Sequence, residues 1–241
     1  MKPQDLVQLL NEYFDEMLKI VTHYEGTLDK FIKDAIMAIY GAPRTVEGHG
    51  LKAVHAALDM RDRLDQLRPK WLAEGKPEIK VGMGIATDAV IVGNVGSSER
   101  LNYTAMGDGV NLASRLEGTA KVYGVPIVLS ENTWLQAREG VLTRELDLLR
   151  VVGKKQPVRI FEAVERMGKA TDAVRTVVDQ FHFGLSLYRQ QRWDDAAKHF
   201  QFVLSVKADD GPARLFLDRC ARFKAHPPGP GWDTVADMQS K

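Results

Sequence analysis

Residues 100–118 read RLNYTAMGDGVNLASRLEG, and this stretch decides the fold. We expect a loop that turns at Gly107 and then becomes a helix. Apolar residues follow at helical spacing: Val110, Leu112, Ala113 and Leu116. Asn111 and Arg115 are four residues apart in this segment, so their side chains share one face of the helix. Taken alone, an Asn and an Arg at this spacing are usually only a solvated surface.

A second stretch, DKFIKDAIMAIYGAP at residues 29–43, has the pattern of a β-hairpin. Strands are expected at residues 27–32 and 35–40, with a tight turn at Lys33 and Asp34. Aspartate is an ordinary turn residue, so its presence at this tip does not by itself indicate a function.

The segments around these two stretches alternate between helix and strand patterns. Amphipathic helices are expected at residues 1–21 and 46–67, and a short helix is expected at 131–137 with Ser130 as its N-cap. Strands are expected at residues 79–85, at a hairpin partner around 90–92, and at 125–129, 143–151 and 158–164. Because strands and helices interleave, the predicted class is α/β or α+β around one mixed sheet.

Beyond about residue 167 the sequence changes to helical patterns only. Small and large residues there match the positions of one tetratricopeptide repeat (TPR), with a third helix starting near Pro212: Gly184, Leu187, Trp193, Ala196, Phe200 and Val203. We therefore expect three regions, namely a first domain at 1–166, a TPR-like helical region at 167–225 and a tail rich in proline and glycine at 226–241. One repeat is too few for a solenoid, so we expect the helices to pack on the first domain, to extend a dimer interface or to bind a protein partner.

Composition excludes some classes of partner. The chain has 33 basic and 32 acidic residues, so no overall field draws it to nucleic acid or to an anionic membrane. A single cysteine, Cys220, forms no internal disulfide, and no apolar run reaches the length of a membrane span. We expect a cytoplasmic protein; a membrane anchor elsewhere in a longer parent protein stays open.

Together, DKFIKDAIMAIYGAP and RLNYTAMGDGVNLASRLEG, with VGMGIATDAVIVGNVG at residues 81–96 between them, resemble the catalytic core of class III adenylyl cyclases. The resemblance covers most of residues 5–164. It implies an α+β fold with a ferredoxin-like mixed sheet and a head-to-tail homodimer with composite active sites at the subunit interface. The implied reaction converts ATP to cyclic AMP and pyrophosphate with the help of two divalent metal ions, Mg²⁺ or Mn²⁺.

The resemblance also implies roles for individual residues. Asp34 matches a metal-binding aspartate. Asn111 matches the asparagine that orients the ribose, and Arg115 the arginine that meets the charge on the α-phosphate. Lys30 and Thr104 match the pair that recognises the base. Lysine can only donate and adenine N1 can only accept, whereas guanine N1 carries a hydrogen, so Lys30 favours adenine and Thr104 can accept from its amino group.

Several positions depart from the family pattern. The family carries a first metal-binding aspartate on a strand before the opening helix, and this sequence has no such stretch, so we expect an N-terminally truncated domain. Lys33 stands where the hairpin turn usually has glycine, and Asp88 also replaces a typical glycine. Val152 replaces a lysine that contacts the triphosphate, and Lys154 and Lys155 are the candidate substitutes.

Two functions therefore remain open at this stage. The first is an adenylate cyclase catalytic domain whose activity in this chain is impaired, since a single Asp34 does not hold two metals in the expected geometry. The second is a catalytically inactive pseudo-cyclase that acts as a nucleotide-binding or dimerising regulatory module.

Overall fold

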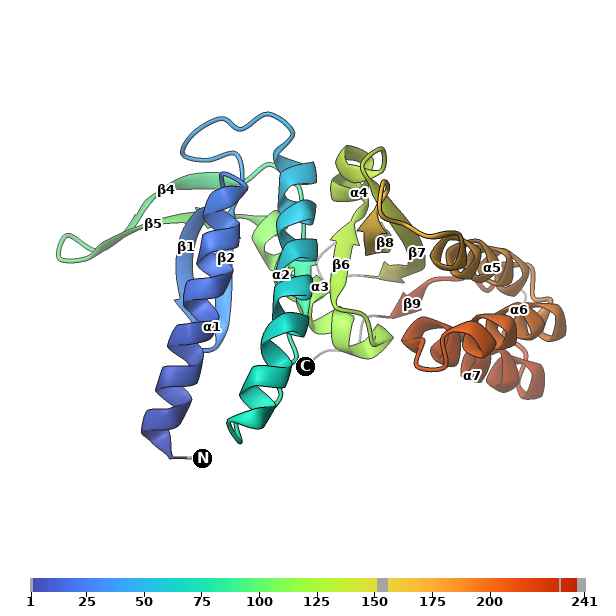
Figure 1. Ribbon diagram of the computed structural model, residues 1–241. Coiled ribbons are helices and arrows are strands. Elements are labelled where there is room, and N and C mark those ends of the chain that lie inside the picture. The colour runs from blue at the N-terminus through green and yellow to red at the C-terminus, as the bar shows by residue number, and fades with distance from the viewer. Residues whose placement is uncertain (1, 151–155, 230, 238–241) are drawn as a thin grey trace.

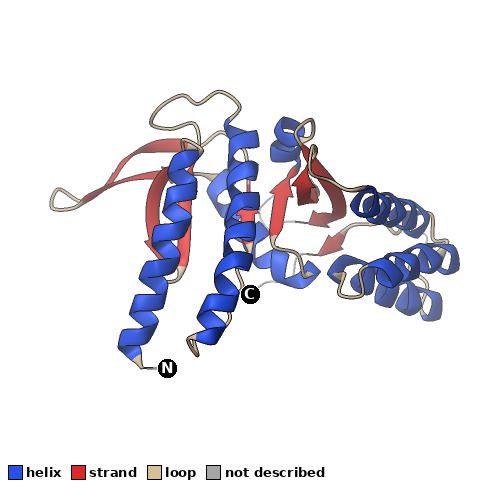
Figure 2. Cartoon of the chain, in the orientation of Figure 1, coloured by secondary structure: helices blue, strands red, loops and turns tan. Residues whose placement is uncertain are grey.

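The computed structural model describes residues 2–150, 156–229 and 231–237 (Figure 1). Its helices are α1 (Pro3–His23), α2 (His49–Ala73), α3 (Asp108–Tyr123), α4 (Glu131–Ala137), α5 (Asp172–Arg189), α6 (Trp193–Val206) and α7 (Gly211–Ala225). Its strands are β1 (Thr27–Ile32), β2 (Ala35–Ile39), β3 (Met83–Ile85), β4 (Ile91–Gly96), β5 (Leu101–Met106), β6 (Ile127–Ser130), β7 (Val141–Arg150), β8 (Val158–Arg166) and β9 (Ala236–Asp237). The mixture of helices and strands in Figure 2 confirms the α+β class.

The main sheet is mixed, as predicted, and has the strand order β3-β6-β8-β7-β9. β3 and β6 run parallel, β8 is antiparallel to both β6 and β7, and β9 is parallel to β7. The sequence suggested one sheet, but the hairpins β1-β2 and β4-β5 form two further sheets of two strands each. These hairpins lie beside α1 and α2, on the side of the molecule away from α5–α7 (Figure 1).

The predicted pairing of residues 79–85 with 90–92 is wrong. β3 pairs with β6, and β4 pairs with β5, a segment that was expected to be a loop. Residues 101–103 of β5 are all exposed, so this strand lacks the alternation of buried and exposed residues that reveals a strand in sequence. The hairpin closes locally, through reciprocal backbone hydrogen bonds between Ser97 and Arg100.

α1 is an amphipathic helix, as predicted, and one of its faces is buried against α2. Leu9, Tyr13 and Met17 recur every four residues along that face. They form one hydrophobic cluster with Leu64, Leu67 and Trp71 of α2. α2 continues six residues beyond its expected end at residue 67, because Trp71 in its last turns is fully buried.

α3 is held tightly between the sheet and the C-terminal helices. A Cβ atom at Gly84 of β3 would lie 2.1 Å from the carbonyl oxygen of Ala113 in α3, so the two backbones are in close contact. A Cβ at Gly211, the first residue of α7, would lie 2.3 Å from the carbonyl oxygen of Tyr123 at the other end of α3. Only glycine fits such close backbone approaches. The position of α3 therefore depends on its close contacts with both β3 and α7.

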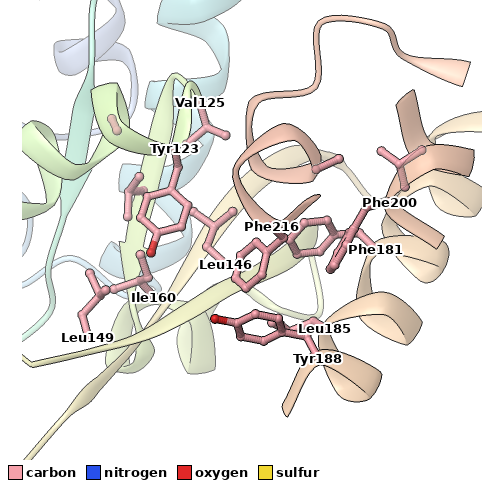
Figure 3. Packing of buried hydrophobic residues seen from close by; sticks show 14 of the residues in the cluster. Tyr123, Val125, Leu146, Leu149, Ile160, Phe181, Leu185, Tyr188, Phe200 and Phe216 are labelled. Carbon is pink, nitrogen blue, oxygen red and sulfur yellow. The ribbon is translucent and has the colours of Figure 1, made fainter. Parts of the chain in front are cut away.

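A single hydrophobic core joins α3, the sheet and the three C-terminal helices (Figure 3). Phe181, Phe200 and Phe216 of α5, α6 and α7 pack together, with ring centroids 5.4 to 5.6 Å apart. Leu146 and Ile160 of the sheet and Tyr123 of α3 belong to the same cluster. The three expected helices are present and pack on the first domain; their assignment to the TPR class stays a prediction.

Buried charges reinforce this junction. The guanidinium group of Arg144 in β7 is 2% exposed and pairs with Glu162 in β8 and with Asp210, the N-cap of α7. Arg219 of α7 binds Asp147 of β7 at 2.5 Å. These ion pairs fix the C-terminal helices to the sheet, since a buried charge requires its partner.

The C-terminal tail behaves as a strap in the part that is described. Trp232 packs against Tyr188, Trp193 and Phe223, with ring centroids 5.4 to 5.5 Å apart. The short strand β9 then adds to the edge of the main sheet beside β7. In the described part of the chain, no helix has the length and apolar character needed to cross a membrane.

Candidate active site

The β1-β2 hairpin forms as predicted and presents Lys30 and Asp34. Lys30 lies in β1, with its side chain 42% exposed. Asp34 is exposed in the two-residue turn, after Lys33, whose φ of 58° lies in the left-handed region. A lysine in this conformation is strained in a way that glycine is not. Burial and the negative charge of Asp34 raise the pKa of Tyr13 in α1 to about 12.

Thr104 in β5 lies beside Lys30 through a residue that the sequence analysis did not single out, Asp29. The Thr104 hydroxyl donates to Asp29 Oδ2 at 2.8 Å, and the backbone N–H of Ala105 donates to the same oxygen at 3.0 Å. The other carboxylate oxygen, Oδ1, lies 3.3 Å from Lys30 Nζ. Asp29 therefore connects the two residues that were predicted to recognise the base.

The β4-β5 ribbon leaves space next to Thr104. Gly93 is the direct cross-strand partner of Thr104, and a Cβ at Gly93 would meet no atom within 4 Å. Directly paired residues in antiparallel strands project to the same face. The absence of a side chain at Gly93 thus leaves open space on this face of the ribbon.

The structure places Asn111 and Arg115 on the first half of α3, directly after β5. Asn111 is exposed and Arg115 is half-buried. α3 begins at Asp108 after Gly107, as the sequence predicted, and ends at Gly124, whose φ of 66° gives a left-handed cap. α3 packs on β3 and β6, whereas Asp34 lies in the separate β1-β2 hairpin. The predicted phosphate-binding residues Lys154 and Lys155, and Val152, lie outside the described residues.

A two-metal centre requires several oxygen ligands close together. Within residues 2–150, 156–229 and 231–237, no group of three or more His, Cys, Asp or Glu side chains is placed to hold a metal ion. Asp34 therefore does not form a complete two-metal site with other described residues of its own chain. The described residues of one chain do not fit the expected pair of ions.

Sequence reasoning identified Lys30 and Thr104 but missed Asp29, which is fully buried at the side chain. The signal was present as an acidic residue inside a strand whose other residues include Leu28, Phe31 and Ile32, directly before Lys30. The sequence analysis also missed the buried ion pairs of Arg144 with Glu162 and Asp210, because these residues are far apart in the sequence. Asp210 could have been found as an acidic N-cap before Gly211-Pro212.

Comparisons with known proteins identify the family of the first 164 residues. The pattern of the adenylate and guanylate cyclase catalytic domain matches residues 1–164. Adenylate cyclase 1 of Rhizobium meliloti is 38% identical over 162 residues, which cover 67% of this chain and 24% of that protein. The chain spans between 10% and 33% of the length of three adenylate cyclases that it matches.

Solved structures show the same fold. The crystal structure of the adenylyl cyclase CyaB from P. aeruginosa has a TM-score of 0.66 and 34% identity, and covers 71% of this chain and 88% of that chain. The crystal structure of the guanylyl cyclase Cya2 has a TM-score of 0.65 and 31% identity, and covers 71% of this chain and 86% of that chain. Residues 1–164 of this chain therefore make it a member of the adenylate and guanylate cyclase catalytic domain family.

Proposed function

We propose that this domain converts ATP to 3′,5′-cyclic AMP and pyrophosphate as part of a signal-transduction protein. The observation that carries the proposal is the juxtaposition of Lys30 and Thr104, joined by Asp29 at 3.3 Å and 2.8 Å. A lysine donor and a hydroxyl acceptor at this place match adenine N1 and the adenine 6-amino group. The similarity to adenylate cyclases, one of them 38% identical, supports the same choice of base.

The remaining site residues would act on the sugar and the phosphates. Asn111 would hold the ribose, so that its 3′-hydroxyl faces the α-phosphate. Arg115, one helical turn further along α3, would pair with the negative charge that builds on the α-phosphate oxygens. Lys154 and Lys155 are candidates for contacts with the triphosphate. The tight packing of α3 on Gly84 would keep Asn111 and Arg115 at fixed positions.

We propose that the domain works as a head-to-tail homodimer. Large apolar side chains are exposed on β1, β4 and β5, the strands that carry the base-binding pair: Phe31, Ile32, Ile91, Leu101, Tyr103 and Met106. Ile91 is 73% exposed and Leu101 is 60% exposed. Several large exposed apolar side chains on neighbouring strands usually mark an interface. A second copy of the chain would cover it and complete the site.

We further propose that this chain, assayed alone, is a weak enzyme. Two divalent ions, Mg²⁺ or Mn²⁺, would supply activation of the 3′-hydroxyl and charge neutralisation in the family. Asp34 is the only predicted metal ligand here, and no larger group of candidate ligands surrounds it among the described residues. The same observation favours the second candidate function, a pseudo-cyclase that binds nucleotide and dimerises.

The test is cyclic AMP formation from ATP with Mn²⁺ by the purified chain, compared with an Arg115→Ala variant. Lys121→Ala, which alters an exposed residue near the end of the same helix, is the matched control. We expect slow formation of cyclic AMP that is lost in Arg115→Ala and kept in Lys121→Ala. A dimeric chain that binds ATP but forms no cyclic AMP would favour the pseudo-cyclase instead.

A further inference from the structure

Asp29 occupies an irregular position in β1 that re-aims its side chain. Leu28 pairs with Ala38 and Lys30 pairs with Met37, so Asp29 is the extra residue of a β-bulge. In a regular strand, Asp29 and Lys30 would project to opposite faces. A bulge changes this alternation and is a common device for directing a side chain beside a site. Here the Asp29 carboxylate reaches β5 while its Oδ1 stays 3.3 Å from Lys30 Nζ.

The contact with Asp29 uses the only hydrogen of the Thr104 hydroxyl. That hydrogen bond is 2.8 Å long, whereas the alternative acceptor, the carbonyl oxygen of Ala105, is 3.5 Å away. The N–H of Ala105 binds the same carboxylate oxygen and holds it in place. A hydroxyl group has one donor and two acceptor positions. Thr104 is therefore left with acceptor positions only.

We propose that Asp29 is a specificity-positioning residue that fixes Thr104 as a hydrogen-bond acceptor toward the base. An acceptor at this place pairs with the 6-amino group of adenine and opposes the 6-oxo group of guanine, which can only accept. Without Asp29 the hydroxyl is free to rotate and donate to guanine O6. The inference rests on the proposed function, in which Lys30 and Thr104 hold the base, and it assigns the choice of base to a third residue.

The burial of Asp29 supports this role over a purely structural one. Its side chain is fully buried, and Oδ1 makes no hydrogen bond to any described residue. A buried acceptor without a hydrogen bond lowers stability, so packing alone does not favour a carboxylate at this position. The same oxygen, Oδ1, lies 3.3 Å from Lys30 Nζ, and this ion pair keeps the lysine donor on the same side as Thr104.

The experiment measures the preference for adenine in a double-mutant cycle. 3′-Deoxy-ATP and 3′-deoxy-GTP lack the attacking hydroxyl, so their binding to the full chain with Mg²⁺ is measurable by calorimetry without turnover. The variants are Asp29→Ala, Asp29→Asn, Thr104→Val and the double variant Asp29→Ala/Thr104→Val. An asparagine carbonyl still accepts from Thr104 and Ala105, whereas alanine removes the acceptor.

We expect Asp29→Ala to reduce the preference for 3′-deoxy-ATP about tenfold, the effect of one mispaired hydrogen-bonding group. Asp29→Asn should keep the wild-type preference, and Asp29→Ala should have no further effect once Thr104 is valine. The inference is overturned if folded Asp29→Ala keeps the wild-type preference for 3′-deoxy-ATP. It is also overturned if Asp29→Ala reduces that preference equally when Thr104 is already valine. If Asp29→Ala does not fold, the Thr104 variants provide the test. Thr104→Ser should keep the preference for 3′-deoxy-ATP, and Thr104→Val should lose it. Equal preferences in Thr104→Ser and Thr104→Val overturn the inference.

The same data separate this inference from the proposed function. A chain that prefers 3′-deoxy-ATP but makes no cyclic AMP from ATP contradicts the proposed reaction and leaves the role of Asp29 standing. A chain that binds both nucleotides equally contradicts the role of Asp29. Binding of neither nucleotide contradicts both.

Discussion

Replacing Arg144 with methionine should destabilise the protein more than any exposed substitution. Its guanidinium group binds Glu162 Oε2 at 2.8 and 2.6 Å, and both oxygens of Asp210 at 2.9 Å. The three side chains are 2%, 7% and 0% exposed. Removing Arg144 leaves two carboxylates buried next to each other. Lys207, 3.5 Å from Asp210 and half-exposed, is the only other cation paired with either carboxylate among the described residues.

Breaking a buried ion pair by removing one partner costs about 3–5 kcal/mol, and we expect Arg144→Met to lose that much free energy of unfolding. Urea unfolding followed by circular dichroism measures the loss. Arg159→Met is the matched control, because Arg159 pairs with Glu131 on the surface and such pairs contribute about 0–1 kcal/mol. Adding Glu162→Gln and Asp210→Asn to Arg144→Met should recover part of the stability. If Arg144→Met and Arg159→Met were equally stable, the buried cluster would not hold the C-terminal helices on the sheet.

Three further substitutions test other parts of the structure. Gly84→Ala should displace α3 by ~1 Å, lower the melting temperature and slow cyclic AMP formation at least ~tenfold, whereas Gly168→Ala, where a Cβ meets open space, should change neither. Lys33→Gly should raise the free energy of unfolding by ~0.5–1 kcal/mol in urea unfolding, because φ there is 58°; an unchanged value would contradict the strain. Burial lowers the pKa of His182 below its ordinary value of 6.5. As the pH drops below 6.5, the His182 imidazole is protonated in the unfolded chain before it is protonated in the folded chain, so the free energy of unfolding falls. His182→Gln should therefore reduce the stability difference between pH 7.5 and 5.5, and the exposed control His226→Gln should leave it unchanged.

The fold could be predicted wherever the sequence carried a periodic signal with one buried face. α1 shows this clearly, since its buried residues recur every four positions. β5 could not be predicted in the same way, because exposed residues lie on both faces of its first half. α2 passes Pro69, which normally ends a helix, because the burial of Trp71 outweighs the lost backbone hydrogen bond.

Those residues of the candidate site that lie within short sequence motifs could be predicted from the sequence. Lys30 and Asp34 are found on the expected hairpin and Asn111 and Arg115 on the expected helix, whereas Thr104 lies in β5, a segment that was expected to be a loop. Contacts between distant segments carry no local signal. Asp29 meets Thr104 across 75 residues of sequence, and only the bulge in β1 makes that contact visible.

The most direct test of the account is a competition between ATP and GTP at equal concentrations, with Mn²⁺ and the full 241-residue chain. Chromatography of the products measures cyclic AMP and cyclic GMP in the same sample. The acceptor at Thr104 and the donor at Lys30 predict that cyclic AMP predominates. Cyclic GMP formed at an equal or higher rate would contradict the assignment of this site to adenine.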